Sequence, residues 1–192
     1  MDKARAIIEF WVNEVGPSGW YLGTDGLDQS IRDKFMDDWE AAKTGAYDGW
    51  ARCPEKSLAL LILLDQFPRN MFREDPRAFA TDKKAREVAS VAIEQGFDKR
   101  NDEPQRQFYY MPFMHSECLQ HQERSVRLIK DRLPESGAGN ILHAKVHREV
   151  IRTFGRFPYR NGALSRTSTL QEQKFMEDGG YAAISKKIEK AA

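Results

Sequence analysis

Residues 58–64 read Leu-Ala-Leu-Leu-Ile-Leu-Leu and form the longest aliphatic run of the chain. Pro54 and Glu55 precede the run, and both residue types favour the first turn of a helix. A helix that is apolar on every side has to be surrounded by other elements. Seven residues are too few to cross a bilayer, which takes about 20 in a helix. The run therefore predicts a buried central helix and no membrane-spanning segment.

Helical periodicity also dominates the rest of the sequence, and no segment alternates as a strand does. The predicted helices cover about 2–15, 28–44, 54–67, 82–95, 104–113, 117–132, 140–154 and 169–175. We expect Gly16–Gly19 and Pro68 to end helices, and Asp28, Ser116 and Thr169 to cap them. The predicted fold is all-α, with one domain over residues 1–192. We expect antiparallel helix pairs that form a right-handed tetratricopeptide-like superhelix or a compact helical array, although the sequence shows no clean repeat period of the tetratricopeptide type.

Composition excludes several classes of protein. The 30 basic and 29 acidic residues give a net charge of +1, which argues against binding nucleic acid through bulk charge. Two cysteines, Cys53 and Cys118, and an N-terminus without a signal sequence favour a cytoplasmic location. The glycine-rich nucleotide motifs, the zinc-protease motif and the serine-hydrolase motif are all missing from the sequence. We expect no cofactor.

Two polar segments stand out beside apolar helices. The first is Asp65-Gln66-Phe67-Pro68-Arg69-Asn70, where a carboxylate at a helix C-terminus needs a cationic partner such as Arg69. The second contains His115 and Glu117, and a histidine beside a carboxylate is suited to proton transfer. In both segments the competing interpretation is a structural ion pair or hydrogen bond.

A third region concentrates positive charge. The window 145–166 carries +5, so the rest of the chain carries −4. Five of its six basic residues are arginines, whose planar fork matches carboxylate and phosphate. Phenylalanine, tyrosine and proline separate these arginines, which favours a packed loop. The polar candidates of this window are His147, Arg148, Arg152, Arg156, Arg160 and Asn161.

Five motifs resemble the bacterial domain-of-unknown-function 924 family. They are Leu-Leu-Asp-Gln-Phe-Pro-Arg-Asn (63–70), Arg-Ala-Phe-Ala-Thr-Asp (77–82), Pro-Phe-Met-His-Ser-Glu (112–117), Gln-Glu-Arg-Ser-Val (122–126) and Phe-Gly-Arg-Phe-Pro-Tyr-Arg-Asn (154–161). The resemblance spans nearly the whole chain and implies a tetratricopeptide-like helical fold, but it brings no established activity. Tyr159 departs from the family, which commonly has histidine there, and Cys118 stands where the family more often has an acid.

Three functional hypotheses follow. In the first, the polar segments line one pocket for a small anion (carboxylate or phosphate), with His115 or His147 as acid or base, oriented by Asp65 or Glu117. Its ligand-binding residues are Gln66, Arg69, Asn70, Arg148, Arg152, Arg156, Arg160 and Asn161. In the second, a helical groove binds an acidic peptide or a C-terminal carboxylate. In the third, the same residues only hold the fold together.

A metal site is the weakest alternative. His143 and His147 have workable ligand spacing, but Lys145 and Arg148 beside them repel a cation. We therefore predict no metal. The sequence does not decide whether the protein is an enzyme, and it leaves the oligomeric state open.

Overall fold

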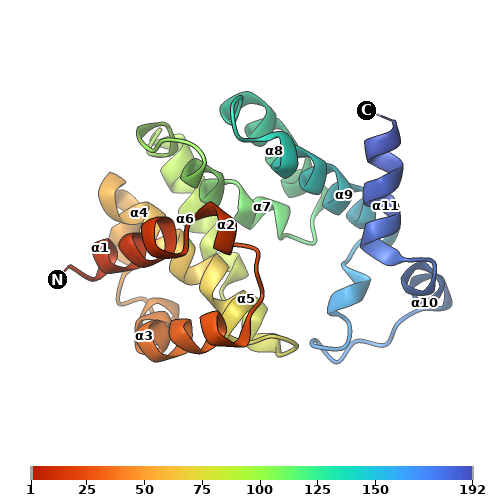
Figure 1. Cartoon of the computed structure of the whole chain (residues 1–192), viewed down its shortest axis with the longest axis horizontal. Coiled ribbons are helices and arrows are strands. Elements are labelled where there is room, and N and C mark those ends of the chain that lie inside the picture. Colours follow the sequence, from red (N-terminus) through yellow and green to blue (C-terminus); the bar gives the residue numbers. More distant parts are fainter. Residues whose placement is uncertain (1, 192) are drawn as a thin grey trace. The chain divides into compact units, whose positions relative to one another are not determined.

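The computed structural model describes residues 2–191, which form helices and connecting turns without a strand (Figure 1). This confirms the predicted all-α class. The chain divides into two compact units, Met1–Pro112 and Phe113–Ala192. The single domain over 1–192 stays a prediction, as does the superhelix.

The N-terminal unit is built around the apolar run. Its elements are α1 (Lys3–Ile8), η1 (Glu9–Val15), α2 (Gly16–Gly19), α3 (Asp25–Thr44), η2 (Asp48–Arg52), α4 (Pro54–Leu61), η3 (Ile62–Gln66), α5 (Phe67–Met71), η4 (Pro76–Phe79), α6 (Asp82–Glu94), η5 (Asp98–Arg100) and η6 (Gln105–Tyr109). Leu58 to Leu64 are all buried, as the sequence predicts. The α4 helix contacts α1, η2 and α6, so the apolar run is covered on several sides.

Aromatic rings fill the space around this central helix. Phe67 is fully buried and its ring packs edge-on against Trp11, with centroids 5.5 Å apart. Phe35 of α3 meets the same ring at 4.9 Å. Buried aromatic side chains of this size dominate the energetics of a core. The three elements that carry these rings are thereby locked around the end of the apolar run, where Asp65 lies.

The C-terminal unit is a smaller helical assembly. After α7 (Met111–Met114), which straddles the boundary, it contains α8 (Leu119–Arg132), α9 (Ala138–Phe154), η7 (Pro158–Arg160), α10 (Leu170–Glu177) and α11 (Gly180–Lys190). The α9 helix packs against α8 and α11. A buried cluster of Val150, Ile151 and Phe157, covered by Phe154 and Ile184, joins the C-terminal half of α9 to the segment that follows it.

Several predicted helix boundaries are wrong. Pro68 does not end the central helix, because a π-helical turn, η3, precedes it and lets Pro68 start α5, where no N–H is needed. Asp28 is not a cap: Thr24 caps α3, and Asp28 is buried in its first turn. Ser116 does not cap α8, since Cys118 holds that position and the Ser116 hydroxyl pairs with His121.

Other boundary predictions are confirmed or wrong only in part. Thr169 forms the predicted cap, within a full capping box with Glu172. Gly16, with a φ of +66°, ends η1, but the chain then makes one more helical turn, with Pro17 at its start. The last helix, α11, was not predicted.

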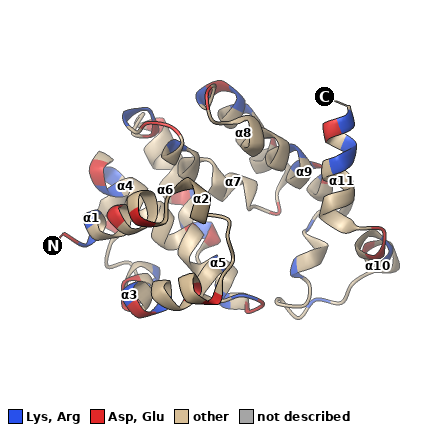
Figure 2. Cartoon of the chain, viewed as in Figure 1, with Lys and Arg blue, Asp and Glu red and all other residues tan. Residues whose placement is uncertain are grey.

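Basic and acidic residues are interspersed along the helices of both units (Figure 2). In the part of the chain that the structure describes, no helix is long and apolar enough to span a bilayer.

Candidate functional site

Asp65 is buried at the end of the apolar run, with partners from its own segment. Gln66 Nε2 donates to Asp65 Oδ2 at 2.5 Å. Arg69 Nη1 lies 3.4 Å from Asp65 Oδ1 and donates to the backbone oxygen of the same residue at 2.5 Å. The other arm of Arg69 reaches Asp82 Oδ1 at 2.9 Å. The predicted cationic partner of Asp65 is therefore present, and it ties the start of α6 to α5.

Asn70 belongs to a second ion-pair group of the N-terminal unit. Its side-chain nitrogen donates to the Gln66 carbonyl at 3.2 Å, and its oxygen accepts from Arg73 Nη2 at 3.1 Å. Arg73 also binds both carboxylate oxygens of Asp28, including one by Nη2 at 3.0 Å. Both polar atoms of the Asn70 side chain are therefore hydrogen-bonded, as expected if Asn70 stabilises the fold.

Tyr21 brings a hydroxyl into the same unit. Its oxygen is hydrogen-bonded to Gln107 Oε1 and lies 4.0 Å from the Met111 sulfur. Burial of the hydroxyl, and then the charge of Asp65, raise the pKa of Tyr21 to about 12. The sequence did not predict a role for Tyr21, because no polar motif in residues 16–23 indicates that its hydroxyl forms a hydrogen bond.

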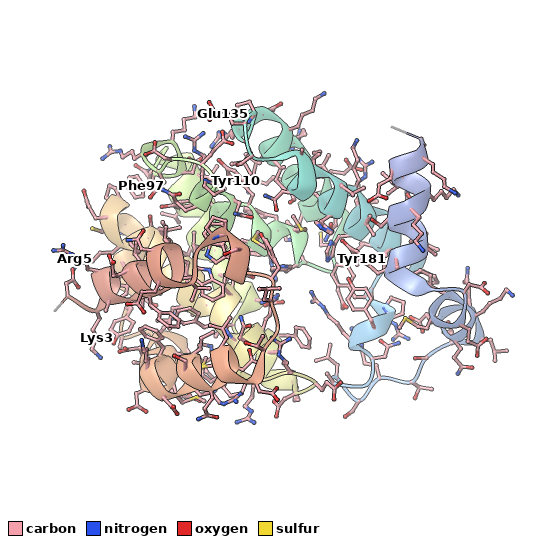
Figure 3. The ribbon with its side chains drawn as sticks, viewed as in Figure 1. Lys3, Arg5, Phe97, Tyr110, Glu135 and Tyr181 are labelled. Atoms are coloured by element: carbon pink, nitrogen blue, oxygen red, sulfur yellow. The ribbon has the colours of Figure 1, made fainter. Side chains whose placement is uncertain are left out.

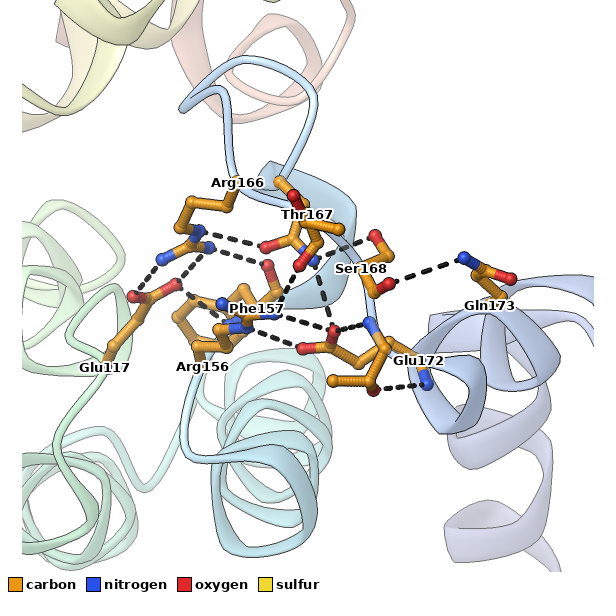
Figure 4. Close-up of polar contacts among 10 residues, drawn as sticks. Glu117, Arg156, Phe157, Arg166, Thr167, Ser168, Glu172 and Gln173 are labelled. Carbon is orange, nitrogen blue, oxygen red and sulfur yellow. Dashed lines mark hydrogen bonds and ion pairs between the residues drawn. The ribbon is translucent and has the colours of Figure 1, made fainter.

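In the C-terminal unit, Glu117 clamps the segment that follows α9 (Figure 4). Its carboxylate accepts two bonds from Arg166, at 2.7 and 2.9 Å, and one from the Phe157 backbone N–H at 2.9 Å. Burial works to raise the pKa of Glu117, but Arg166 and the Phe157 N–H outweigh it, so the pKa lies below its usual value. Arg166 also donates to Asn161 Oδ1 at 2.9 Å. We call Glu117 and Arg166 the clamp.

Arg156 forms a second pair on the same segment (Figure 4). Its Nε and Nη2 donate to the two carboxylate oxygens of Glu172 at 2.6 and 2.8 Å. Glu172 also accepts from the Thr169 backbone N–H at 2.7 Å. Arg156 is the main reason that the pKa of Glu172 is lowered to about 2. Asn161 joins this network through Ser168, at 3.0 Å.

Two further arginines of α9 pair with acids on helix surfaces. Arg148 Nη1 lies 3.2 Å from Glu123 of α8, and Arg152 pairs with Glu149 one turn away on its own helix. The side chains of Glu123 and Glu149 are 50% and 36% exposed, so these pairs contribute little to stability. Predicted ligand-binding residues Arg148, Arg152 and Arg156 thus all have carboxylate partners, and their assignment to a ligand stays a prediction.

His115, Arg160 and His147 lie close together in the C-terminal unit. Arg160 is largely buried, donates to the His115 backbone oxygen at 3.0 Å and stacks over the Phe157 ring at 4.3 Å. The rings of His115 and His147 are 6.4 Å apart, centre to centre. This brings together three of the residues that the sequence analysis assigned to the site.

His147 borders a hollow of about 510 Å³, which we call the His147 hollow. Its walls come from α9, η7 and the α10–α11 turn. Its lining consists of His147, Tyr159, Met176, Gly179, Gly180, Tyr181 and Ala182. Figure 3 shows Tyr181 at the start of α11. The Tyr181 ring packs edge-on against His147 at 5.3 Å and against Tyr159 at 6.4 Å.

The hydrogen bond of His147 determines which of its two ring nitrogens carries the hydrogen. Its Nδ1 lies 2.8 Å from the backbone oxygen of His143, and a carbonyl only accepts, so Nδ1 carries the hydrogen. Burial, and then the nearby charge of His115, lower the pKa of His147 to about 3. Near neutral pH the ring is therefore uncharged. Its Nε2 is an acceptor, and it has no protein partner among residues 2–191.

The first residues of α11 also line the hollow. The α11 helix begins at Gly180 without a side-chain cap and without an acid in its first turn. Its basic residues gather toward its other end (Figure 2). The first N–H groups of a helix have no partner inside it. The N–H groups of Gly180, Tyr181 and Ala182 are of this kind, and these residues belong to the lining.

The sequence analysis missed much of this arrangement. Arg166 and Glu172 were not singled out as partners of Glu117 and Arg156, and Tyr181 lies in a helix that was not predicted. The one available signal was Thr169 three residues before Glu172, which is the pattern of a capping box. No cluster of metal-ligating side chains occurs among the described residues.

The predicted site residues therefore fall into two groups. Asp65, Gln66, Arg69 and Asn70 belong to the N-terminal unit, and the other eight belong to the C-terminal unit. That all of them line a single pocket stays a prediction, as does the alternative groove for an acidic peptide.

These features define an all-helical protein with buried ion-pair networks and a histidine–tyrosine hollow at the start of a helix. The chain belongs to the DUF924 family of bacterial proteins of unknown function, whose model matches residues 7–180. It is similar to the solved structure of a protein of unknown function from Agrobacterium tumefaciens, with 40% sequence identity and a TM-score of 0.85. The match covers 91% of this chain and 97% of that one. No curated protein matches the sequence.

Proposed function

We propose that the C-terminal unit binds a small organic anion in the His147 hollow. The observation that carries this proposal is that the uncapped start of α11 borders an open hollow of about 510 Å³. Cavities of roughly 300–1,000 Å³ are typical of small-molecule sites. Free N–H groups at a helix N-terminus, together with the helix dipole, favour negative charge.

The electrostatics around the hollow support an anion over a cation. None of its lining residues is acidic. The positive charge of Arg160 reaches the site, because it is one of the causes that lower the pKa of His147. A cation would meet the positive end of α11, and no residue of the lining supplies a carboxylate to balance its charge.

A charge placed at the hollow tests the proposal. Ala182 is exposed and lines the hollow, whereas Ala183 is exposed and does not. Ala182→Glu and Ala183→Glu both add an acid to the first turn of α11, which favours the helix in each case. We expect benzoate, measured by isothermal titration calorimetry, to bind the wild type and the Ala183→Glu variant, and to lose most of its affinity for Ala182→Glu.

Benzylamine serves as the cationic control, because it has a similar body and the opposite charge. Absence of benzoate binding at millimolar concentration, equal binding of benzylamine, or unchanged binding by Ala182→Glu would each overturn the proposal. Acid–base catalysis by His115 or His147 stays a prediction of the sequence.

A further inference from the structure

The α11 helix is packed only lightly against the rest of the C-terminal unit. Gly180 at its start is buried, and every other described residue of the helix is exposed or half-buried. One apolar attachment is Ile184, which packs against the cluster that contains Val150 and Phe157. Elements with few buried contacts open at a small cost in free energy, while the rest of the molecule stays folded. The α11 helix can therefore open locally.

Two consecutive glycines separate α11 from α10. Gly179 has a φ of +97° and Gly180 has a φ of +51°. Glycine adopts positive and negative φ about equally readily, so this turn has several accessible conformations. A short segment that absorbs such backbone changes is what a hinge between two helices requires.

Tyr181 supplies the polar attachment of α11 and projects toward α9 (Figure 3). Its hydroxyl is hydrogen-bonded to His143 Nδ1 at 2.5 Å. Its ring stacks on that of His143, with centroids 5.9 Å apart, and lies edge-on to His147 at 5.3 Å. The docked helix therefore covers one side of the His147 ring.

The docked arrangement disfavours a proton on His147. The titratable and charged groups that face its ring are His115, His143, Arg160 and Tyr181, with Tyr159 across the hollow, and none of these is a carboxylate. The positive end of the α11 dipole lies beside the same ring. Loss of solvent around the ring, and then the charge of His115, lower the pKa of His147 to about 3.

Opening of α11 changes these surroundings. It removes Tyr181 and the helix end from the His147 ring and lets water reach the ring on that side. A proton then binds His147 more readily in the open state than in the docked state. By linkage, protonation of His147 and opening of α11 favour each other.

From this arrangement we propose that α11 is a hinged helix, which turns away from α9 in mild acid when His147 takes up a proton. The inference does not depend on the proposed function, because it concerns the packing of α11 and needs no ligand. Gly180, Tyr181 and Ala182 also line the His147 hollow, so opening takes away one of its walls.

Amide hydrogen exchange of the full chain, measured by NMR at pH 7 and pH 5, tests the proposal. Each rate is divided by the intrinsic rate at the same pH, which gives the population of the open state. If opening returns the pKa of His147 from about 3 to 6.5, this population rises about 25-fold between pH 7 and pH 5. Because His115 and Arg160 stay near the ring, we expect a rise of about 5- to 25-fold for the amides of Ile184 to Ile188.

The amides of Val146 and Val150 in α9 serve as the internal reference, because both residues are fully buried in the helix that α11 leaves. At pH 7 the α11 amides should be protected at least about tenfold less than these reference amides, since local opening costs less than unfolding of the unit. Equal protection would show that α11 opens only when the whole unit unfolds, and would overturn the hinge.

Two variants test the contacts. His147→Asn cannot titrate, but its side-chain nitrogen can still donate to the His143 carbonyl, so its α11 protection should stay the same at both pH values. Tyr181→Phe keeps the ring and removes the hydroxyl bonded to His143, so it should raise the open population about fivefold at both pH values.

The outcomes separate the parts of the proposal. Unchanged α11 protection between pH 7 and pH 5 in the wild type, or the same decrease in His147→Asn, would overturn the coupling to His147. If His147→Asn does not fold, the wild-type comparison between α11 and α9 and the Tyr181→Phe variant still decide. No effect of Tyr181→Phe at either pH would overturn the attachment through Tyr181.

Discussion

The C-terminal unit is predicted to lose stability in acid because of His147. Folding lowers the pKa of His147 from 6.5 to about 3, chiefly because the ring is buried. Between these two pH values the unfolded chain binds more protons than the folded chain, so the free energy of unfolding rises with pH. The contribution of His147 is complete above pH 6.5 and is lost as the pH falls toward 3.

The size of the effect follows from the two pKa values. At pH 5 the folded ring is still neutral while the unfolded ring is almost fully protonated, so His147 alone lowers the free energy of unfolding by about 2 kcal/mol relative to pH 8. The groups that face it are His115, Arg160, His143 and Tyr181. None of them supplies a negative charge near neutral pH that would favour the imidazolium.

The assay is urea unfolding followed by circular dichroism at pH 8 and at pH 5. His147→Asn removes the titrating ring and keeps a donor for the His143 carbonyl, so we expect it to lose about 2 kcal/mol less than the wild type between the two pH values. Gln171→Asn, an exposed change in the same unit that removes no titratable group, serves as the control, with a loss like that of the wild type. Equal losses for wild type and His147→Asn would refute the reasoning.

Three further changes test the packing and the ion-pair networks by thermal and urea unfolding. Leu61→Ala, in the fully buried run, should cost about 2–5 kcal/mol, and a loss below 1 kcal/mol would contradict a central position for α4. Thr169→Ala removes the cap of α10 and should cost about 1 kcal/mol, while Ser185→Ala, at a partly exposed position of α11, serves as the control and should cost less. Glu172→Gln keeps the capping geometry but removes the charge facing Arg156, and should cost about 2 kcal/mol; an unchanged midpoint would show that the pair is not structural.

The fold class could be predicted because it depends on local patterns. The run from Leu58 to Leu64 demands burial wherever it is placed, and Thr169 with Glu172 specifies a helix start within four residues. The error at Pro68 has a physical origin. A π-helical turn inserts one extra residue per turn, and no residue type marks its position in advance.

For the candidate site, the sequence predicted the types of residue involved but not which of them contact one another. Glu117 and Arg166 are 49 positions apart, and the sequence does not indicate that they pair, since any arginine can pair with any carboxylate. His147 was chosen for its chemistry, yet the hollow beside it depends on Tyr181 and on the start of α11. A helix that begins without a capping side chain lacks the usual sequence signal for its start. The absence of a capping side chain also leaves the first N–H groups of α11 without a side-chain partner.

The clamp has a consequence for how relatives of this chain diverge. Glu117 holds the backbone of Phe157, and the next residue but one, Tyr159, is a wall of the hollow. A substitution in the clamp is therefore expected to move that wall without altering any residue of the proposed site. If the proposal holds, relatives with identical linings differ in ligand preference when their clamps differ, and the cause lies in the supporting ion pairs rather than in the hollow itself.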